Sequence, residues 1–253
     1  MSGQGPTYNT RMNLLAFELS TEACSVALWV DGDVRERHEI APRKHAEFAL
    51  PWAETLLAEA GIAKSQLDAV AVGRGPGAFT GVRLGVAIAQ GIALALDRPA
   101  VPVSTLAALA MRAAGQGAGD GAQVLAAIDA RMREVYAGAF AFARDADGAF
   151  SLRALDAERV AAPDAMTLPD GIDWFGVGTG FSAESGILRE RFAPQLHAVD
   201  AEALPHAADV AALAHAAFLR GEAVAPEHLE PAYLRNQVAL TLVEQQALRA
   251  GRA

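Results

Sequence analysis

One pattern occurs twice along this chain, and it constrains the fold more than any other feature. Leu14–Glu18 (LLAFE) and Leu125–Asp129 (LAAID) are apolar, strand-like segments that end in a carboxylate. Each is followed by a short polar turn and a second strand-like segment. Strands joined by short turns and followed by helices and further strands are typical of α/β proteins. The repetition therefore predicts two similar halves.

Apolar residues at helical spacing predict helices over His45–Ala60 and Thr80–Leu96, and Ser104 is a suitable N-cap for a third helix. The predicted strands are 13–19, 25–30, 34–40, 68–73, 99–103, 124–129, 134–143, 149–155 and 173–177, and the predicted second-half helices are 182–192 and 207–220. Two three-stranded meanders, each followed by α/β units, are typical of the actin-like, sugar-kinase and Hsp70 (ASKHA) architecture. We therefore expect two βββαβα-type halves.

The glycine-rich segment Gly115–Gly121 is the expected boundary between the halves. It divides the chain into an N-terminal half over residues 12–114, which contains the partner-binding helices discussed below, and a C-terminal half over residues 122–238. We expect residues 1–11 to be a disordered extension of undetermined origin, and residues 239–253 to be a loosely ordered tail.

Composition limits the classes of function. The formal net charge is −9, so the overall field repels phosphate, and we expect this chain to meet RNA only indirectly, through another subunit. The N-terminus has no signal-peptide pattern, and the longest apolar run, Leu84–Leu96, is shorter than the roughly 20 residues that span a membrane. Cys24 is the only cysteine, so no intramolecular disulfide forms. We expect it to be buried, and the protein to be cytoplasmic with no membrane contact.

A glycine-rich segment, Gly73–Gly81 (GRGPGAFTG), joins a predicted strand to a predicted helix. Glycines at such a junction allow close approach of the backbone to an anion, although a tight turn without ligand has the same composition. The segment lacks the Gly-Lys-Ser/Thr of a P-loop. The candidate nucleotide or anion contacts are Gly73, Arg74, Gly75, Gly77, Thr80, Gly178, Thr179 and Gly180.

The chain shows no complete catalytic or metal site. Glu18 and Asp129 occupy equivalent strand ends, but the loop Ala130–Arg133 after Asp129 has no glycine, serine or threonine to surround a phosphate. The histidines do not have the spacing of a helical metal site, and no Gly-x-Ser-x-Gly motif is present. We predict no catalytic residue, no metal and no tightly bound cofactor.

Several segments together resemble the TsaB (YeaZ) family, from about Met12 to about Val238. The resemblance rests on GRGPGAFTGVRLG at residues 73–85, VSTL at 103–106, AIDARM at 127–132, EVY at 134–136, GTG at 178–180 and YLR at 233–235. It implies a subunit of tRNA threonylcarbamoyladenosine biosynthesis that is a catalytically silent relative of TsaD. Such a subunit acts with TsaD and the ATPase TsaE to place threonylcarbamoyl on N6 of adenosine 37, in tRNAs that read codons beginning with A.

The resemblance also has consequences for single positions. Thr105 and Leu109 stand where the catalytic relative has two metal-binding histidines, and Glu18 replaces the usual aspartate of the family. The resemblance implies a TsaD-type partner that forms a heterodimer with this chain, and a TsaE-type ATPase that acts with them. It also implies a homodimer when the chain is alone. Any ATP or ADP is expected to bind at the partner interface. The alternatives are an ATP-dependent small-molecule kinase of the same fold class and a peptidase-like protein.

The resemblance places the partner surface on the two helices of the first half. Two patterns support this placement. The helix His45–Ala60 has apolar residues on more than one face, and the helix Thr80–Leu96 has two rows of small residues. A helix that buries only one face would need apolar or small residues on that face alone. One small row could face the sheet and the other the partner. The predicted contact residues are Phe48, Trp52, Leu56, Gly81, Gly85, Ala89 and Gly91.

Overall fold

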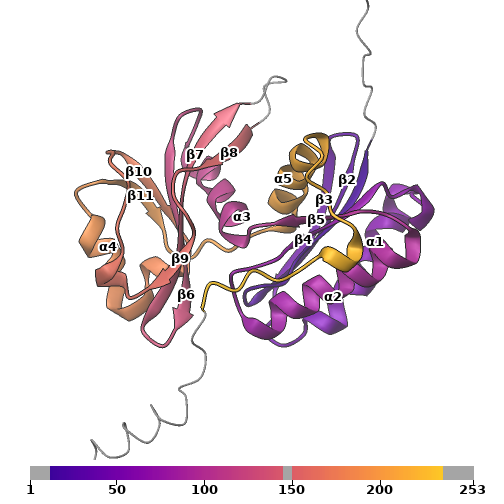
Figure 1. The fold of residues 1–253 in the computed structure, drawn as a ribbon, viewed down its shortest axis with the longest axis horizontal. Helices are drawn as coiled ribbons and strands as arrows, with labels where there is room; N and C mark the ends of the chain where they lie inside the picture. The colour runs from indigo at the N-terminus through magenta and orange to yellow at the C-terminus, as the bar shows by residue number, and fades with distance from the viewer. Residues whose placement is uncertain (1–11, 145–149, 236–253) are drawn as a thin grey trace, which may run out of the picture.

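The computed structural model describes residues 12–144 and 150–235, which form two α/β lobes lying side by side (Figure 1). The first sheet has the order β3-β2-β1-β4-β5 and the second has the order β11-β10-β6-β7-β8, with β9 also paired to β7. The first-sheet strands are β1 (Asn13–Glu18), β2 (Ala23–Val30), β3 (Asp33–Ile40), β4 (Ala69–Gly73) and β5 (Ala100–Val103). The second-sheet strands are β6 (Gln123–Arg131), β7 (Glu134–Arg144), β8 (Phe150–Ala154), β9 (Arg159–Ala161), β10 (Trp174–Val177) and β11 (Leu196–Asp200).

Both sheets begin with an antiparallel meander and continue with parallel strands, which confirms the predicted ASKHA-type α/β fold. The helices are α1 (His45–Ala60), α2 (Phe79–Leu96), α3 (Thr105–Met111), α4 (Ile187–Phe192) and α5 (Ala207–Leu219). Gly61, in the left-handed conformation, ends α1 as its sequence predicts. Cys24 lies in the core of the first lobe, and burial raises the pKa of its thiol to about 12.

The predicted helix over residues 182–192 is wrong in its first part. Glu184 and Ser185 adopt left-handed conformations, so this stretch forms a 3-10 turn over Ala183–Gly186 and a short α4. The prediction also missed β9 and β11. The segment between β9 and β10 contains only a 3-10 turn, Pro163–Ala165, so the two halves are less alike than predicted.

Two helices are exchanged between the lobes. On α3, Leu106 and Leu109 pack against Val124 and Phe140 of the second sheet. On α5, Val210 and Ala211 pack in a cluster with residues of β1, β2 and β4. In Figure 1, α1 and α2 cover one side of the first sheet and α5 the other. The lobes therefore differ from the predicted chain segments 12–114 and 122–238 by these two helices. The predicted extension and tail lie outside the described residues.

Side chains of the first sheet hold the N-terminus of α5. The carboxylate of Glu36 on β3 accepts a hydrogen bond from the backbone N–H of Ala208 at 3.0 Å, and Ser25 Oγ accepts one from the N–H of Ala207 at 2.8 Å. Glu36 also contacts Ser25 Oγ at 2.7 Å and His206 Nδ1 at 2.9 Å. Burial would raise the pKa of Glu36, but these hydrogen bonds outweigh it and lower the pKa to about 2. Helix N-termini favour such a carboxylate.

We expect Glu36→Gln to lower the free energy of unfolding at pH 7 by about 2 kcal/mol, because it removes a charged hydrogen-bond acceptor. The folded pKa of Glu36, about 2, lies below its ordinary value of 4.5, so its stabilisation is complete above pH 4.5 and is lost as the pH falls towards 2. Urea denaturation should therefore show a smaller difference at pH 3 than at pH 7. Glu39→Gln, at an exposed position of the same strand, is the control. A difference independent of pH would contradict this account.

Candidate functional site

The glycine segment after β4 packs against the turn between β1 and β2. A Cβ atom added to Gly77 would lie 2.3 Å from the carbonyl oxygen of Ser20, and one added to Gly81 would lie 2.0 Å from that of Leu19. The backbone N–H of Ala78 donates to the same Ser20 oxygen at 2.7 Å. These glycines therefore allow two backbone segments of this chain to meet.

Glu18 fills the space beside Gly73. Its carboxyl group is buried, and a Cβ atom on Gly73 would lie 1.8 Å from its Oε2. Ser20 donates to Glu18 from its backbone N–H, at 2.8 Å, and from its hydroxyl group. Thr105 Oγ1 lies 3.1 Å from Glu18 Oε2 and 2.9 Å from Ser20 Oγ, and accepts from the N–H of Gly75 at 3.2 Å.

Burial raises the pKa of Glu18 above its ordinary value, although hydrogen bonds from Ser20 and Thr105 oppose the shift. The hydroxyl contacts agree with a neutral carboxyl group. If Glu18 is ionised, both hydroxyl protons point at it and none is left for the contact between Ser20 and Thr105. If Glu18 is protonated, it donates to Thr105, which donates to Ser20, which donates back to Glu18. Each contact then has one proton.

The second lobe has a corresponding arrangement. A Cβ atom on Gly178 would lie 2.3 Å from the carbonyl oxygen of Ala127 and 2.5 Å from Cδ2 of Leu109, and Gly180 also packs on Ala127. Thr179 Oγ1 accepts a hydrogen bond from the N–H of Asp129 at 3.1 Å. Leu109 itself is fully buried. The glycine segment after β4 therefore contacts α3 at Thr105, and the segment after β10 contacts α3 at Leu109, one helical turn later.

Two further candidate residues, Arg74 and Thr80, are exposed. Glu158, in the second lobe before β9, reaches Ser104 at the N-cap of α3 and lies near Arg74. Burial raises the pKa of Glu158, with Ser104 and Arg74 opposing. The space beside Gly73, Gly77 and Gly81 is taken up by Glu18 and the Leu19–Ser20 backbone. Packing within this chain therefore accounts for these three glycines.

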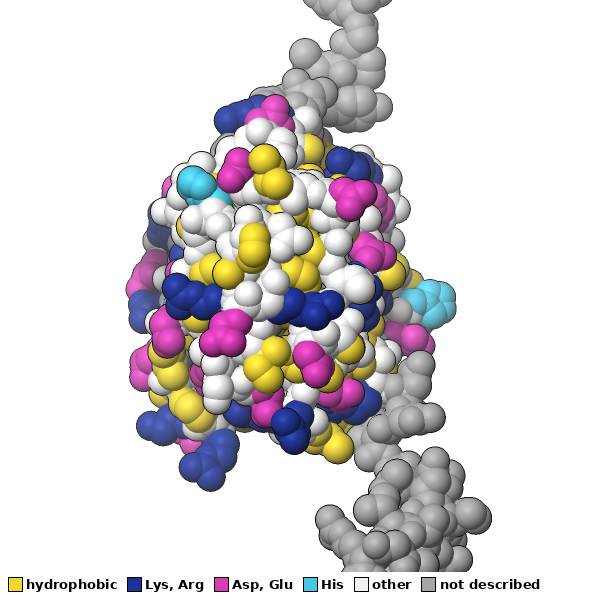
Figure 2. All heavy atoms as spheres, turned by 90° about the vertical axis from the view of Figure 1, so that its left-hand side faces the viewer, with side chains coloured by type: hydrophobic (Ala, Val, Ile, Leu, Met, Phe, Trp, Pro, Cys, Tyr) yellow, Lys and Arg dark blue, Asp and Glu magenta, His cyan; other side chains and the backbone are white. Residues whose placement is uncertain are grey.

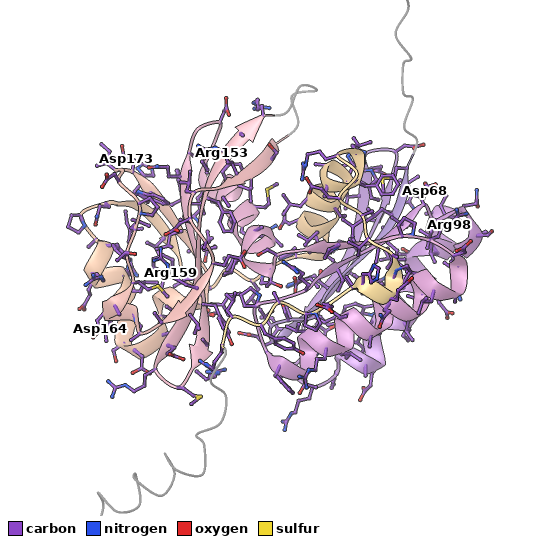
Figure 3. All side chains as sticks on the ribbon, in the orientation of Figure 1. Asp68, Arg98, Arg153, Arg159, Asp164 and Asp173 are labelled. Atoms are coloured by element: carbon purple, nitrogen blue, oxygen red, sulfur yellow. The ribbon has the colours of Figure 1, made fainter. Side chains whose placement is uncertain are left out.

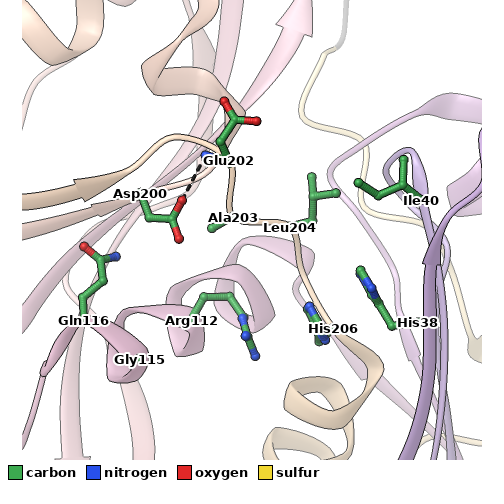
Figure 4. A pocket seen from close by; sticks show the side chains of 10 residues that line it. All are labelled: His38, Ile40, Arg112, Gly115, Gln116, Asp200, Glu202, Ala203, Leu204 and His206. Carbon is green, nitrogen blue, oxygen red and sulfur yellow. Dashed lines mark hydrogen bonds between the residues drawn. The ribbon is translucent and has the colours of Figure 1, made fainter.

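A separate cavity of about 330 Å³ opens between the lobes (Figure 4). His38 and His206 stack in it with their ring centroids 3.9 Å apart, and the end of α3 contributes Arg112. Burial and the neighbouring His206 lower the pKa of His38. Arg112 pairs with Asp209 at 3.2 Å, and burial raises the pKa of Asp209 to about 6. The pairs Arg112–Asp209 and His206–Glu36 beside this cavity connect α3, α5 and β3, while the buried Nε2 of His38 has no hydrogen-bond partner among the described residues.

The structure corrects part of the predicted partner surface. Leu56, Gly85 and Ala89 are buried in the first lobe, and a Cβ atom on Gly85 would lie 3.2 Å from Val72. Gly81 is half-buried against Leu19. These positions face this chain's own sheet and cannot contact a partner. Phe48 and Trp52 are half-buried and stack on each other with centroids 4.9 Å apart.

The second small row of α2 does face outward. Ala87, Gly91 and Ala95 are exposed, and nothing lies within 4 Å of a Cβ atom added to Gly91. Large apolar side chains flank this row, with exposed fractions of 59% for Phe79 and 55% for Leu94, and 47% for Leu50 on α1. The prediction missed Leu50, Phe79 and Leu94. Leu94 lies three residues after Gly91, on the same side of the helix, so helical spacing could have found it.

Helix α2 is long and apolar enough to cross a membrane, yet a third of it is buried in the chain. The buried third packs on β4 through Val82, Val86 and Ala89. The helix is therefore a layer of the first lobe, with an apolar outer face. We call this face, made by Phe79, Ala87, Gly91, Leu94 and Ala95, the outer face of α2.

The lobes and their loops define an ASKHA-class protein whose glycine segment after β4 packs against its own Glu18 side chain and Leu19–Ser20 backbone. A family model described as "TsaD: tRNA N6-adenosine threonylcarbamoyltransferase" matches residues 38–242. The TsaB protein of Escherichia coli K12 is 43% identical over 234 residues, which cover 90% of this chain and 96% of that protein. The TsaB protein of Haemophilus influenzae is 39% identical and covers 90% of this chain and 95% of its own length.

A solved structure, YeaZ from Pseudomonas aeruginosa, superimposes with a TM-score of 0.77 at 45% identity, covering 88% of this chain and all of that one. The chain belongs to the TsaB family.

We expect Glu18→Gln to be at least as stable as the wild type at pH 8. The neutral amide can take the place of the protonated carboxyl group, donating to Thr105 and accepting from Ser20. Because the folded pKa of Glu18 lies above 4.5, ionisation costs the wild type stability as the pH rises above that value, so the advantage of the amide should grow with pH.

Urea denaturation from pH 4 to pH 8 measures this. Glu18→Ala, which leaves the buried Ser20 hydroxyl group without its acceptor and the buried Thr105 hydroxyl group without its donor, should be less stable at every pH. A Gln variant much less stable than the wild type at pH 8 would show that the donors hold Glu18 ionised.

Proposed function

We propose that this chain is the non-catalytic subunit of an assembly that forms N6-threonylcarbamoyladenosine at adenosine 37 of tRNAs reading codons that begin with A. The relatives named TsaB are described as tRNA threonylcarbamoyladenosine biosynthesis proteins, which supports a role in this modification. In the proposal, a TsaD-type partner carries the transfer chemistry and a TsaE-type ATPase acts with it. This chain is cytoplasmic, forms a homodimer when alone, and meets tRNA only indirectly.

The outer face of α2 carries this proposal. An amphipathic surface helix normally presents polar residues to solvent. After Thr80 and Arg83 near its start, the exposed positions of α2 are Ala87, Gly91, Leu94 and Ala95, which are all small or apolar. Gly91 and Ala87 would let a partner helix approach closely. No contact within the described chain covers this apolar face. A partner that binds there would bury it.

The alternative functions find less support in the site. A kinase of this fold class needs a phosphate loop after both Glu18 and Asp129. Only Ser20 and Thr21 offer suitable residues after Glu18, and Ala130–Arg133 after Asp129 offers none. The metal-histidine positions of the catalytic relative hold Thr105, hydrogen-bonded to Glu18, and Leu109, packed on Gly178. Both observations favour a subunit that contributes surface and not chemistry.

We expect Gly91→Glu to weaken binding of the TsaD-type protein of the same organism at least tenfold, because it places a charge in the proposed interface. A Cβ atom at position 91 has no described atom within 4 Å, and replacing a mid-helix glycine raises helix propensity by up to about 1 kcal/mol, so the variant should fold. Size-exclusion chromatography and calorimetry of the mixed proteins measure the effect.

Leu219→Glu, at the end of α5 on the opposite side of the first sheet, is the matched control because Leu219 is also exposed. It should bind normally. If Gly91→Glu binds as tightly as Leu219→Glu, the outer face of α2 is not the partner surface.

We also propose that this chain alone holds no nucleotide tightly, and that ATP or ADP binds, if at all, where the partner completes a site. Titration calorimetry with ATP and ADP should show no binding to the isolated chain at micromolar concentrations. Repeating the titration with the mixed TsaD-type complex tests the second statement. Micromolar binding to the isolated chain that Glu18→Ala alters would contradict the filled glycine loop.

A further inference from the structure

A ridge of aromatic, methionine and arginine side chains crosses from the first lobe to the second. It comprises Phe79, Arg83, Tyr233, Arg235 and Met132. The guanidinium carbon of Arg83 lies 3.5 Å from the ring centre of Phe79, and its Nε donates to Tyr233 Oη at 2.9 Å. Arg235 continues the ridge, with Nη1 3.7 Å from Met132 Sδ. The exposed fractions are 59% for Phe79, 54% for Tyr233 and 73% for Met132.

The chain after α5 connects the two ends of this ridge. It pairs with β5 between Val224 and Ala100, buries Leu229 in the first core, and donates from the N–H of Ala232 to the carbonyl oxygen of Arg74 at 2.8 Å. It then reaches the second lobe, where Arg235 donates to Glu134 at 2.5 Å and to the carbonyl oxygen of Ala130 at 3.2 Å. Figure 1 shows this strap in yellow, running from beside α2 towards β6.

The tip that presents Met132 is strained. Arg131, Met132 and Arg133 have φ angles of 60°, 56° and 64°, a left-handed conformation that costs a non-glycine residue about 1 kcal/mol or more. Three successive residues of this kind persist only if their surroundings hold them. Asp129 accepts from the N–H of Arg131 at 2.8 Å, and Arg133 pairs with Glu184 at 3.1 Å. The same φ angles belong to the tight turn of the β6–β7 hairpin, in which Arg131 pairs with Glu134, and this turn presents Met132 to solvent.

The charges on the ridge decide between protein and RNA as its occupant. Arg131, Arg133 and Arg235 are each paired with a carboxylate, Asp129 at 2.7 Å, Glu184 at 3.1 Å and Glu134 at 2.5 Å. The net charge of the chain is −9. Figure 2, which faces the outer end of the second lobe, shows basic and acidic side chains intermixed there. Without a surplus of positive charge, phosphate attraction is small.

The composition of the ridge is that of protein interfaces, which are enriched in tyrosine, phenylalanine, methionine and arginine. Phe79 is also the first residue of α2 and part of its outer face, so the ridge and that face are continuous. Within the described residues, no carboxylate pairs with Arg83. A partner surface with apolar pockets and a carboxylate opposite Arg83 would complement the ridge.

We propose that the TsaD-type subunit that covers the outer face of α2 also binds this ridge and so contacts both lobes. This inference rests on the proposed function. It adds that the interface includes second-lobe residues, above all Met132.

Binding of the purified TsaD-type protein to ridge variants, measured by calorimetry, tests this proposal. Met132→Glu should raise the dissociation constant at least tenfold, and Tyr233→Ala several-fold. Met132→Gly should also weaken binding, yet without lowering the melting temperature, because glycine adopts the φ of 56° without strain. Ile172→Glu is the control, since Ile172 is 74% exposed. Ile172 is next to Asp173, which Figure 3 labels, and lies near the start of β6. Met132 follows the end of β6, so the two positions are at opposite ends of that strand.

The outcomes separate the two proposals. If Gly91→Glu abolishes binding while the Met132 and Tyr233 variants bind like Ile172→Glu, the ridge is outside the interface and the proposed function stands. If Gly91→Glu binds normally, the proposed function loses its surface whatever the ridge variants do. If the ridge variants bind the partner normally but lose crosslinking to an unmodified tRNA transcript in the assembled complex, the ridge contacts RNA and the proposal is overturned.

Discussion

Glu18, Ser20 and Thr105 form a buried, hydrogen-bonded cluster where the two lobes join, and much of the structure depends on it. The cluster fixes the end of β1 against the start of α3, because Thr105 is the first residue of that helix. The close approach of Gly77 and Gly81 to the Leu19–Ser20 backbone places the start of α2 on the same turn. Since α3 then packs on the second sheet, and Leu109 meets Gly178, the direction in which α3 leaves this cluster sets the position of the second lobe.

Local patterns predicted the elements of the first half well. Helix α1 ends at Gly61 and α3 begins after Ser104, whose side chain accepts from the N–H of Ala107, because these signals act within one turn of helix. The exchange of α3 and α5 could not be predicted in this way. Their apolar residues show that each helix packs on a sheet, but hydrophobic periodicity does not say which sheet. The left-handed Glu184 and Ser185 gave no glycine signal, and β11 has no fully buried residue to mark it as a strand.

The site shows a related ambiguity. Gly73, Gly77 and Gly81 indicate that something approaches the backbone closely, and a phosphate oxygen or a carbonyl oxygen of the same chain would leave the same glycines in the sequence. Only the three-dimensional contact identifies the neighbour as Ser20 and Leu19. On α2 the sequence showed two small rows and left open which faced the sheet. The structure assigns the row of Gly85 and Ala89 to the sheet and the row of Ala87, Gly91 and Ala95 to solvent.

Two features that present side chains or backbone to solvent, the Gly91 row and the Arg131–Arg133 tip, lie on one continuous surface. Glycine in the middle of a helix costs about 1 kcal/mol relative to alanine, and Gly91 gains no contact within the described chain in return. The left-handed Arg131–Arg133 tip costs a comparable amount at each residue while holding Met132 in solvent. By contrast, Gly77 and Gly178 allow close contacts with the backbone of Ser20 and Ala127. These contacts within the fold offset the conformational entropy that each glycine loses on folding. Gly91 has no packing partner within the described chain, and the tip of the β6–β7 hairpin holds Met132 in solvent. Their shared location on α2 and the adjoining ridge points to a single partner that binds across both lobes.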